Sequence, residues 1–231
     1  MYNSNILNLC QDQLRSSPAR YIKDYNHLKN RVNKSSARYN GKPVPFLYQP
    51  MLYSVQDRDL LREKVGRMND ILKKVIQKYR SDPEFRNYFA FPPVMEKLIL
   101  LDPGYDKFFP VARFDVFYQD AQKLKFCELN ADGTSGMNEN RVLSKLFQDS
   151  RLMDMLKKKY TITPFNLFQS LLKMIINNYQ TFCRKQSFPT HSRPRIAIAD
   201  FTGDGVISEF HELKIFFSRQ GYETVICDPR E

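Results

Sequence analysis

The chain has 231 residues and a mass of 27.4 kDa, a length that suits one large domain or two small ones. Hydrophobic residues make up 42% of the sequence and aromatic residues 13%, with only 8 Gly and 13 Pro, which excludes disordered, collagen-like and linker-like chains. The formal net charge of +11 raises nucleic-acid binding as a first hypothesis, although no known nucleic-acid-binding motif accompanies it.

Membrane spanning, secretion and zinc binding also lack a signal in the sequence. The longest apolar run, residues 98–101, is far short of the roughly 18 residues of a membrane-spanning helix. Residues 1–10 show no basic patch followed by an apolar stretch, so no secretory signal is visible. The four Cys and three His have no ligand spacing, which argues against zinc and against a disulfide framework. We therefore expect a cytoplasmic protein without a membrane partner.

The first of three predicted domains, residues 1–50, is a basic and polar segment. Helices are expected at residues 6–14 and 19–32, because apolar side chains recur there between turn-forming residues. An extended, proline-rich stretch follows over residues 43–50.

The second predicted domain, residues 51–190, begins with a long amphipathic helix over residues 57–80. Its apolar residues recur at alternating steps of three and four: Leu61, Val65, Met68, Leu72, Val75 and Tyr79. Ser54, with Asp57 three residues later, is a start signal for this helix, and Pro83 follows its expected end.

Two neighbouring stretches, residues 111–118 and 123–130, alternate in polarity and have the composition of strands. They predict an antiparallel hairpin with a four-residue connection. In that register Arg113 lies opposite Glu128.

The same register places Asp115 opposite Phe126. Because side chains alternate with a period of two, Arg113, Asp115, Glu128 and Asn130 then emerge on one face of the hairpin. A five-residue connection would instead send Asp115 to the opposite face from Glu128.

This grouping suits a magnesium site. Two ionised carboxylates about 5 Å apart repel by roughly 3 kcal/mol at an effective dielectric of 20, so Asp115 and Glu128 need a cation. Mg²⁺ accepts carboxylate and phosphate oxygens, Asn130 offers a neutral oxygen, and Arg113 offers a fork for a phosphate. The small residues 131–136 form a turn whose amides and hydroxyls could hold another anion.

A plainer alternative stays open. Charged residues that alternate on a hairpin also suit an ordinary solvated face, with Arg113 and Glu128 as a cross-strand ion pair.

The wider charge pattern fits a metal with an anionic substrate, since residues 101–150 carry eight acidic and six basic side chains between more basic neighbours.

A second long helix is expected over residues 165–185, with Thr163 as its cap and Pro164 in its first turn. Its apolar side chains keep helical spacing, which is typical of core packing: Phe168, Leu171, Leu172, Ile175, Ile176, Tyr179 and Phe182.

The third predicted domain, residues 191–231, reads as a Rossmann-like strand–helix–strand unit of a parallel sheet. The strands are expected at residues 195–200 and 223–228 and the helix at residues 206–220. The loop glycines Gly203 and Gly205 suit a tight turn, because the third glycine of a dinucleotide fingerprint is lacking. Two parallel strands make a poor sheet, so we expect the sequence to be cut within a domain.

The run Arg113-Phe-Asp115, followed a dozen residues later by Glu128-Leu-Asn130-Ala-Asp132, resembles the glutathionylspermidine synthase family, a circularly permuted branch of the ATP-grasp ligases. The resemblance is strongest over residues 113–139. It implies an enzyme that joins a small-molecule or peptide carboxylate to an amine, with ATP and Mg²⁺ as cofactors, through an acyl-phosphate.

The resemblance also implies roles for individual residues. Asp115, Glu128 and Asn130 would bind Mg²⁺, and Arg113 would act catalytically on the terminal phosphate or the acyl-phosphate. The residues implied to contact nucleotide or substrate are Arg113, Gly133, Thr134, Ser135, Gly136 and Glu139.

The expected fold class is therefore α/β with an α+β mix. A helical N-terminal part precedes an antiparallel hairpin that carries the acidic site, and a pre-ATP-grasp unit of a truncated ATP-grasp protein ends the chain. Two rivals stay open: a non-catalytic scaffold with the same fold, and a basic nucleic-acid-binding module.

Overall fold

The computed structural model describes residues 4–119, 123–131, 135–201 and 207–231. Within these ranges the chain mixes helices with three two-stranded sheets, which confirms the α+β character expected from the sequence. In the same ranges, no helix has the length and apolar composition that crossing a bilayer requires.

The chain forms two compact units, which are described separately. The first unit combines residues 53–132 with residues 174–190. The second combines residues 3–52, 133–173 and 191–231. Two of the points where the chain passes between the units, after residues 52 and 190, lie close to the predicted domain boundaries after residues 50 and 190. The division into three domains stays a prediction.

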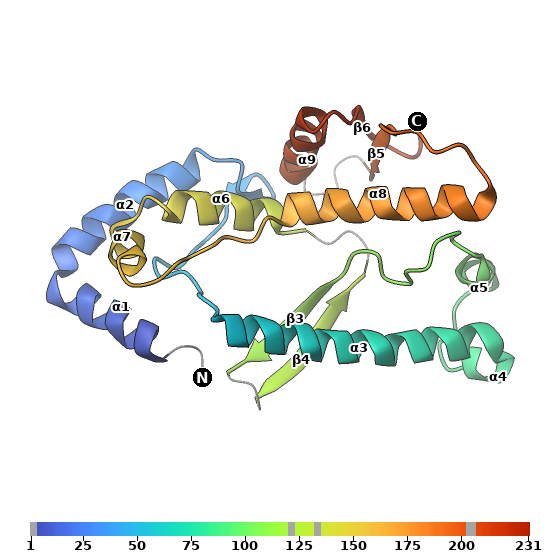
Figure 1. Cartoon of the computed structure of the whole chain (residues 1–231), viewed down its shortest axis with the longest axis horizontal. Helices are drawn as coiled ribbons and strands as arrows, with labels where there is room; N and C mark the ends of the chain where they lie inside the picture. The colour runs from blue at the N-terminus through green and yellow to red at the C-terminus, as the bar shows by residue number, and fades with distance from the viewer. Residues whose placement is uncertain (1–3, 120–122, 132–134, 202–206) are drawn as a thin grey trace. The chain divides into compact units, whose positions relative to one another are not determined.

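A helical core lies in the second unit. It is built by α1 (Ser4–Ser16), α2 (Pro18–Asn33), α6 (Met137–Phe147) and α7 (Arg151–Lys157), as Figure 1 shows. The helices α1 and α2 confirm the two predicted N-terminal helices. The core residues are Cys10, Tyr21, Leu28, Phe147, Leu152, Met153 and Leu156. Their burial joins segments that lie more than 100 residues apart in the sequence.

A short antiparallel hairpin, β1 (Arg38–Tyr39) with β2 (Lys42–Pro43), follows α2. Asn40 and Gly41 occupy its turn with φ angles of 48° and 73°, the left-handed backbone that a two-residue hairpin turn requires. This hairpin is absent from the sequence prediction, which has only an extended stretch from residue 43, although Asn-Gly is a strong hairpin signal.

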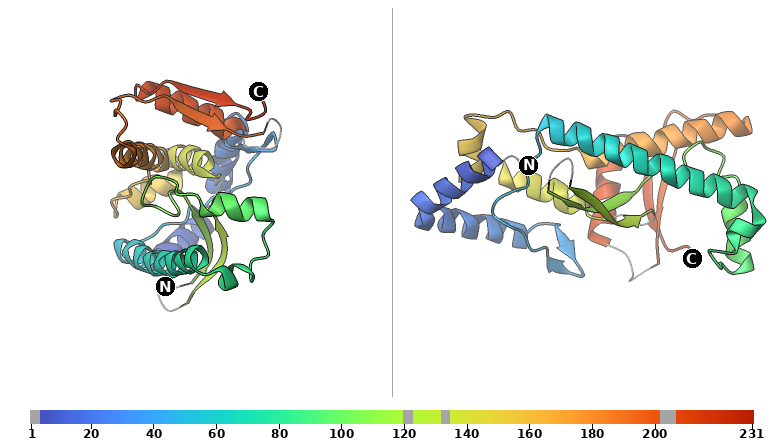
Figure 2. Two further views of the ribbon diagram at one scale, coloured as in Figure 1. Left: turned by 90° about the vertical axis from the view of Figure 1, so that its right-hand side faces the viewer. Right: turned by 90° about the horizontal axis from the view of Figure 1, so that it is seen from below.

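The predicted strand–helix–strand unit is present at the end of the chain. Strands β5 (Ile196–Ala199) and β6 (Thr224–Cys227) pair in parallel, and α9 (Ile207–Arg219) precedes β6 and packs against it. Figure 2 shows the helix alongside the two strands. Gly221 lies just after the end of α9 with a φ of 86°, as the position after a helix often requires.

The first unit is organised around α3 (Val55–Ser81). The Ser54 side chain accepts the backbone N–H of Asp57 at 3.0 Å, and the Asp57 carboxylate accepts the Ser54 N–H at 3.1 Å. This reciprocal capping box is the start signal predicted from the sequence, and it satisfies donors that the first helical turn leaves open.

Two short helices follow α3 in the first unit, α4 (Pro83–Arg86) and α5 (Pro93–Leu100). The following loop contains Gly104, which has a φ of 75°. A Cβ atom built on Gly104 would lie 2.5 Å from the Phe182 ring, so only glycine allows the loop to pack this closely on the helix that carries Phe182.

That helix is α8 (Leu167–Gln186), which begins two residues later than the sequence predicted. The expected cap at Thr163 is wrong, because the Asn166 side chain accepts the Gln169 N–H at 3.1 Å instead. Asn is at least as good a cap as Thr, and Pro164 lies before the helix rather than in its first turn.

Candidate functional site

The predicted site residues lie on a hairpin of the first unit. Strand β3 (Arg113–Tyr118) pairs antiparallel with β4 (Leu124–Asn130). Five residues connect the strands rather than the predicted four, and the Gln119 N–H donates to the Lys123 carbonyl at 3.1 Å. The longer connection changes the register next to the turn.

The predicted register is wrong in both of its key pairs. Asp115 lies opposite Glu128 rather than Phe126, and Arg113 lies opposite Asn130 rather than Glu128. The five-residue connection alone would have turned Asp115 and Glu128 to opposite faces. A β-bulge prevents this, because Cys127 is an extra residue on β4 between the pairs Val116–Phe126 and Asp115–Glu128.

As a result, the two faces of the hairpin differ sharply in chemistry. One face presents Arg113, Asp115, Phe117, Lys125, Glu128 and Asn130. The other presents Phe114, Val116, Tyr118, Leu124, Phe126 and Leu129, all at least partly buried. The four residues predicted to form a site are therefore brought to one face, although by a different register from the one expected.

The apolar face is attached to α3 through Tyr118. The Tyr118 hydroxyl donates to the Asp57 carboxylate, and its ring lies 6.0 Å from the Tyr53 ring between centroids. Partial burial raises the pKa of Asp57, but hydrogen bonds from Tyr118 and Ser54 outweigh it, so that the pKa lies below its usual value. The hairpin is thereby held to α3, beside which it lies in Figures 1 and 2.

On the polar face, the Arg113 Nε atom donates to Asp115 Oδ1 at 3.0 Å. The two side chains are 43% and 41% exposed, so this ion pair is screened by solvent. Direct cross-strand neighbours have Cβ atoms about 4.5–5.5 Å apart, and Glu128 is the direct neighbour of Asp115. Arg113 and Lys125 balance the two negative charges across the face as a whole.

The chemistry of this donor set fits a magnesium ion that also binds phosphate. Asp115 and Glu128 supply oxygens from directly opposed positions, and Asn130 lies one pair along the ladder. The Asn130 Nδ2 atom is buried, and it finds no acceptor among the described residues. Among those residues, no three or more His, Cys, Asp or Glu side chains are arranged to hold a metal ion, so a metal here would need phosphate or water oxygens as well.

The predicted anion-binding turn, residues 131–136, is divided between the units, and only residues 133–136 belong to the second. Three of its residues, Asp132, Gly133 and Thr134, lie outside the described residues. Ser135 and Gly136 are described, and Gly136 is the N-cap of α6 with a φ of 100°. The turn does end at a helix N-terminus, where free N–H groups favour an anion.

An internal carboxylate already occupies these N–H groups. Glu209, from α9, accepts the Asn138 N–H at 2.7 Å and a further backbone hydrogen bond from Gly136. The predicted substrate residue Glu139 lies within hydrogen-bonding distance of Glu209. Glu209 is not among the residues predicted from the sequence, although a signal for it exists.

That signal is its spacing on α9. Glu209, Leu213 and Phe217 follow one another at intervals of four, and all three are buried. A carboxylate at an apolar position of an amphipathic helix is buried only with partners, so the pattern could have marked Glu209 as part of a polar cluster.

Asn138 and Arg141 complete this cluster. The fully buried Asn138 amide donates to the Ser36 carbonyl at 2.8 Å and accepts from an Arg141 terminal nitrogen at 2.8 Å. The same Arg141 nitrogen donates to Glu212 at 2.6 Å, and its guanidinium lies 4.9 Å from the Phe168 ring centroid. Asn138 thereby joins α6 to the segment before β1.

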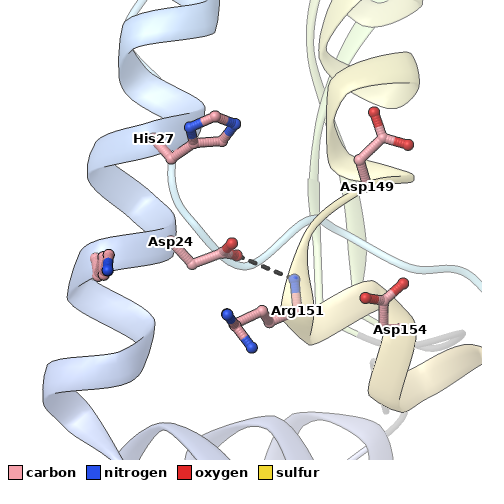
Figure 3. A pocket seen from close by; sticks show the side chains of 6 residues that line it. Asp24, His27, Asp149, Arg151 and Asp154 are labelled. Atoms are coloured by element: carbon pink, nitrogen blue, oxygen red, sulfur yellow. Dashed lines mark hydrogen bonds between the residues drawn. The ribbon is translucent and has the colours of Figure 1, made fainter.

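A separate hollow of about 440 Å³ opens between α2 and α7 (Figure 3). Its lining residues are Lys23, Asp24, His27, Asp149, Arg151 and Asp154. Asp24 accepts the Arg151 N–H at 3.0 Å and the Tyr48 hydroxyl at 2.6 Å, and burial together with Asp24 raises the pKa of Tyr48. The other lining side chains are exposed and of mixed charge, so the hollow is a solvated junction between helices.

Comparison with known proteins adds no relative. No protein-family model matches the chain, and neither a curated protein nor a solved structure is similar to it.

Proposed function

We propose that this chain contributes the magnesium and phosphate site of an ATP-dependent carboxylate–amine ligase of the ATP-grasp type. One observation carries the proposal: a β-bulge restores the direct pairing of Asp115 with Glu128 that the connection length would otherwise abolish. Like charges placed directly opposite each other are unfavourable in an ordinary sheet, so the pairing calls for a cation.

Within this proposal, Asp115, Glu128 and Asn130 would hold Mg²⁺, which would neutralise negative charge on the phosphates of ATP. Arg113 lies next to these oxygens and offsets the negative charge that develops as the γ-phosphoryl group moves to the substrate carboxylate. An amine then attacks the acyl-phosphate carbonyl, and inorganic phosphate leaves as the amide bond forms. The unit formed by β5, α9 and β6 takes the place of the pre-ATP-grasp region.

The competing explanation is a solvated hairpin face on a non-catalytic domain. In that case the Arg113–Asp115 ion pair and the nearby Lys125 fully account for the charges. The two explanations differ in what a divalent cation does, because only the ligase site gains affinity for Mg²⁺ through both carboxylates.

The first test measures binding of Mn²⁺ and of Mg²⁺·ATP to the intact chain and to its Asp115→Asn and Glu128→Gln variants. Each variant keeps the side-chain shape and should weaken binding by at least about 10–100-fold, the loss that follows even when a partner of a metal ligand is removed. Asp59→Asn is the matched control, because Asp59 also pairs with an arginine and its side chain is 52% exposed.

Binding that the two hairpin variants leave unchanged would refute the site. A second test measures ATP turnover in the natural full-length protein, where Asp115→Ala and Glu128→Ala should abolish activity without loss of fold. Intact turnover in either variant would refute the assigned role, whereas metal binding without any turnover would favour the non-catalytic domain.

A further inference from the structure

Two glutamates in the second unit bring their carboxyl groups together, and one of the two is almost fully buried. Glu209, on α9, is only 2% exposed, and Glu139, on α6, lies within hydrogen-bonding distance of it. Neither belongs to the hairpin site, and a pair of ionised carboxylates in such a place is strongly unfavourable.

The hydrogen-bond donors around this pair are unevenly distributed. Glu209 receives backbone N–H groups from Asn138 and Gly136 at the start of α6. The Glu139 Oε2 atom is also buried, yet no donor from the described residues reaches it. A buried acceptor without a donor is costly, and a proton on either carboxyl group would supply the missing hydrogen bond.

The surrounding charges do not neutralise the pair. Arg141 is the cation of the cluster, and its bonding nitrogen is engaged with Glu212 of α9 and with the Asn138 side chain. The guanidinium of Arg38, on β1, is directed to backbone carbonyls instead, as its three hydrogen bonds show.

The other described residues in contact with this cluster are uncharged. Ser36 contacts the cluster through Asn138, and α8 contributes the Phe168 ring beneath Arg141. Three carboxyl groups thus face one arginine, and no metal-binding group of three His, Cys, Asp or Glu exists in the described part of the chain. A proton bound between the carboxyl groups of Glu139 and Glu209 would supply the positive charge that the pair lacks.

We propose that Glu139 and Glu209 share one bound proton, and that this proton acts as a pH-dependent latch between the N-terminus of α6 and the first turn of α9. With the proton bound, one carboxyl donates to the other and the Asn138 and Gly136 N–H groups remain satisfied. Without it, two adjacent negative charges repel across the α6–α9 contact and loosen it.

The direction of the pH effect follows from burial. Burial raises the pKa of Glu209, and the neighbouring Glu139 charge raises it further, against the backbone hydrogen bonds that lower it. The stabilisation from the protonated pair is therefore complete below the ordinary glutamate pKa and is lost as pH rises through the higher pKa of the folded protein.

The test follows thermal unfolding of the intact chain across the weakly acidic to weakly basic range. Glu209→Gln copies the protonated carboxyl, so its Tm should match the unsubstituted protein in acid and exceed it at higher pH. The expected gain is about 3–5 °C for each unit by which the pKa is raised. Glu223→Gln is the control, because Glu223 is an exposed glutamate of the same unit.

Parallel pH profiles for Glu209→Gln and the unsubstituted protein would overturn the proposal. If Glu209→Gln does not fold, carboxyl carbon NMR of the unsubstituted protein decides the question. A signal of Glu209 that titrates well above the other glutamates supports the shared proton, and glutamates that all titrate at ordinary values refute it.

Discussion

The Glu128→Gln substitution separates a metal site from a solvated face by the sign of its effect on stability. Without a divalent cation, the unsubstituted hairpin holds two carboxylates in directly opposed positions. At about 5 Å their repulsion is roughly 3 kcal/mol at an effective dielectric of 20 and about 0.8 kcal/mol in water. Because Glu128 is exposed and Arg113 partly neutralises Asp115, a value of about 1 kcal/mol is appropriate.

Glu128→Gln should therefore raise the Tm of the metal-free protein by about 2–4 °C. With Mg²⁺·ATP present at about 100 times its dissociation constant, the unsubstituted protein should gain roughly 2.7 kcal/mol, or about 5–10 °C, and the variant should gain little. Thermal unfolding followed by circular dichroism, with and without Mg²⁺·ATP, measures both effects.

A lower Tm of the metal-free Glu128→Gln variant would refute the repulsion between Asp115 and Glu128 on which the metal site rests. That result would mean that Glu128 is stabilised by Arg113 or Lys125 as an ordinary member of a charged face. An equal gain from Mg²⁺·ATP in both proteins would likewise place any metal elsewhere.

Three further substitutions test the fold. Ser54→Ala removes the capping box with Asp57 and should cost about 1 kcal/mol in chemical denaturation, whereas Ser54→Asp should retain most of the stability. Gly104→Ala should cost about 2–4 kcal/mol, because it combines a left-handed backbone with a clash against Phe182, and a smaller loss with Phe182→Leu in the background would confirm the clash. Leu152→Ala empties a fully buried core position and should cost about 2–5 kcal/mol, and an unchanged denaturation midpoint would contradict the core assigned to the second unit.

The parts of the fold that depend on local signals could be predicted from the sequence. The capping box of α3 was predicted correctly because Ser54 and Asp57 satisfy each other within one turn, although the helix begins at Val55, two residues before the predicted range. The parallel pairing of β5 with β6 was predicted because a helix between two short apolar strands imposes that direction.

The hairpin register depended on information that the local pattern does not contain. A connection of four or five residues fits the sequence around residue 120 equally well, and nothing in the alternation marks Cys127 as an unpaired residue. The prediction that Asp115 and Glu128 share a face is nevertheless correct, because the extra residue in the turn and the extra residue at the bulge cancel in their effect on the register.

The Glu139–Glu209 pair lay beyond sequence reasoning for a different reason. The two residues are 70 positions apart, and only the packing of α9 onto the start of α6 brings them together. The spacing of Glu209 with Leu213 could indicate burial, but the identity of its partner is a tertiary property.

The bulge at Cys127 has an evolutionary consequence. Twelve residues separate Asp115 from Glu128, and a hairpin without the bulge would need a six-residue turn to keep them opposite each other. Gain or loss of a single residue in this interval moves one of the two carboxylates to the opposite face of the hairpin, unless the bulge is gained or lost at the same time. Homologues that retain the pair should therefore vary this spacing in steps of two, or exchange the bulge for a change in turn length.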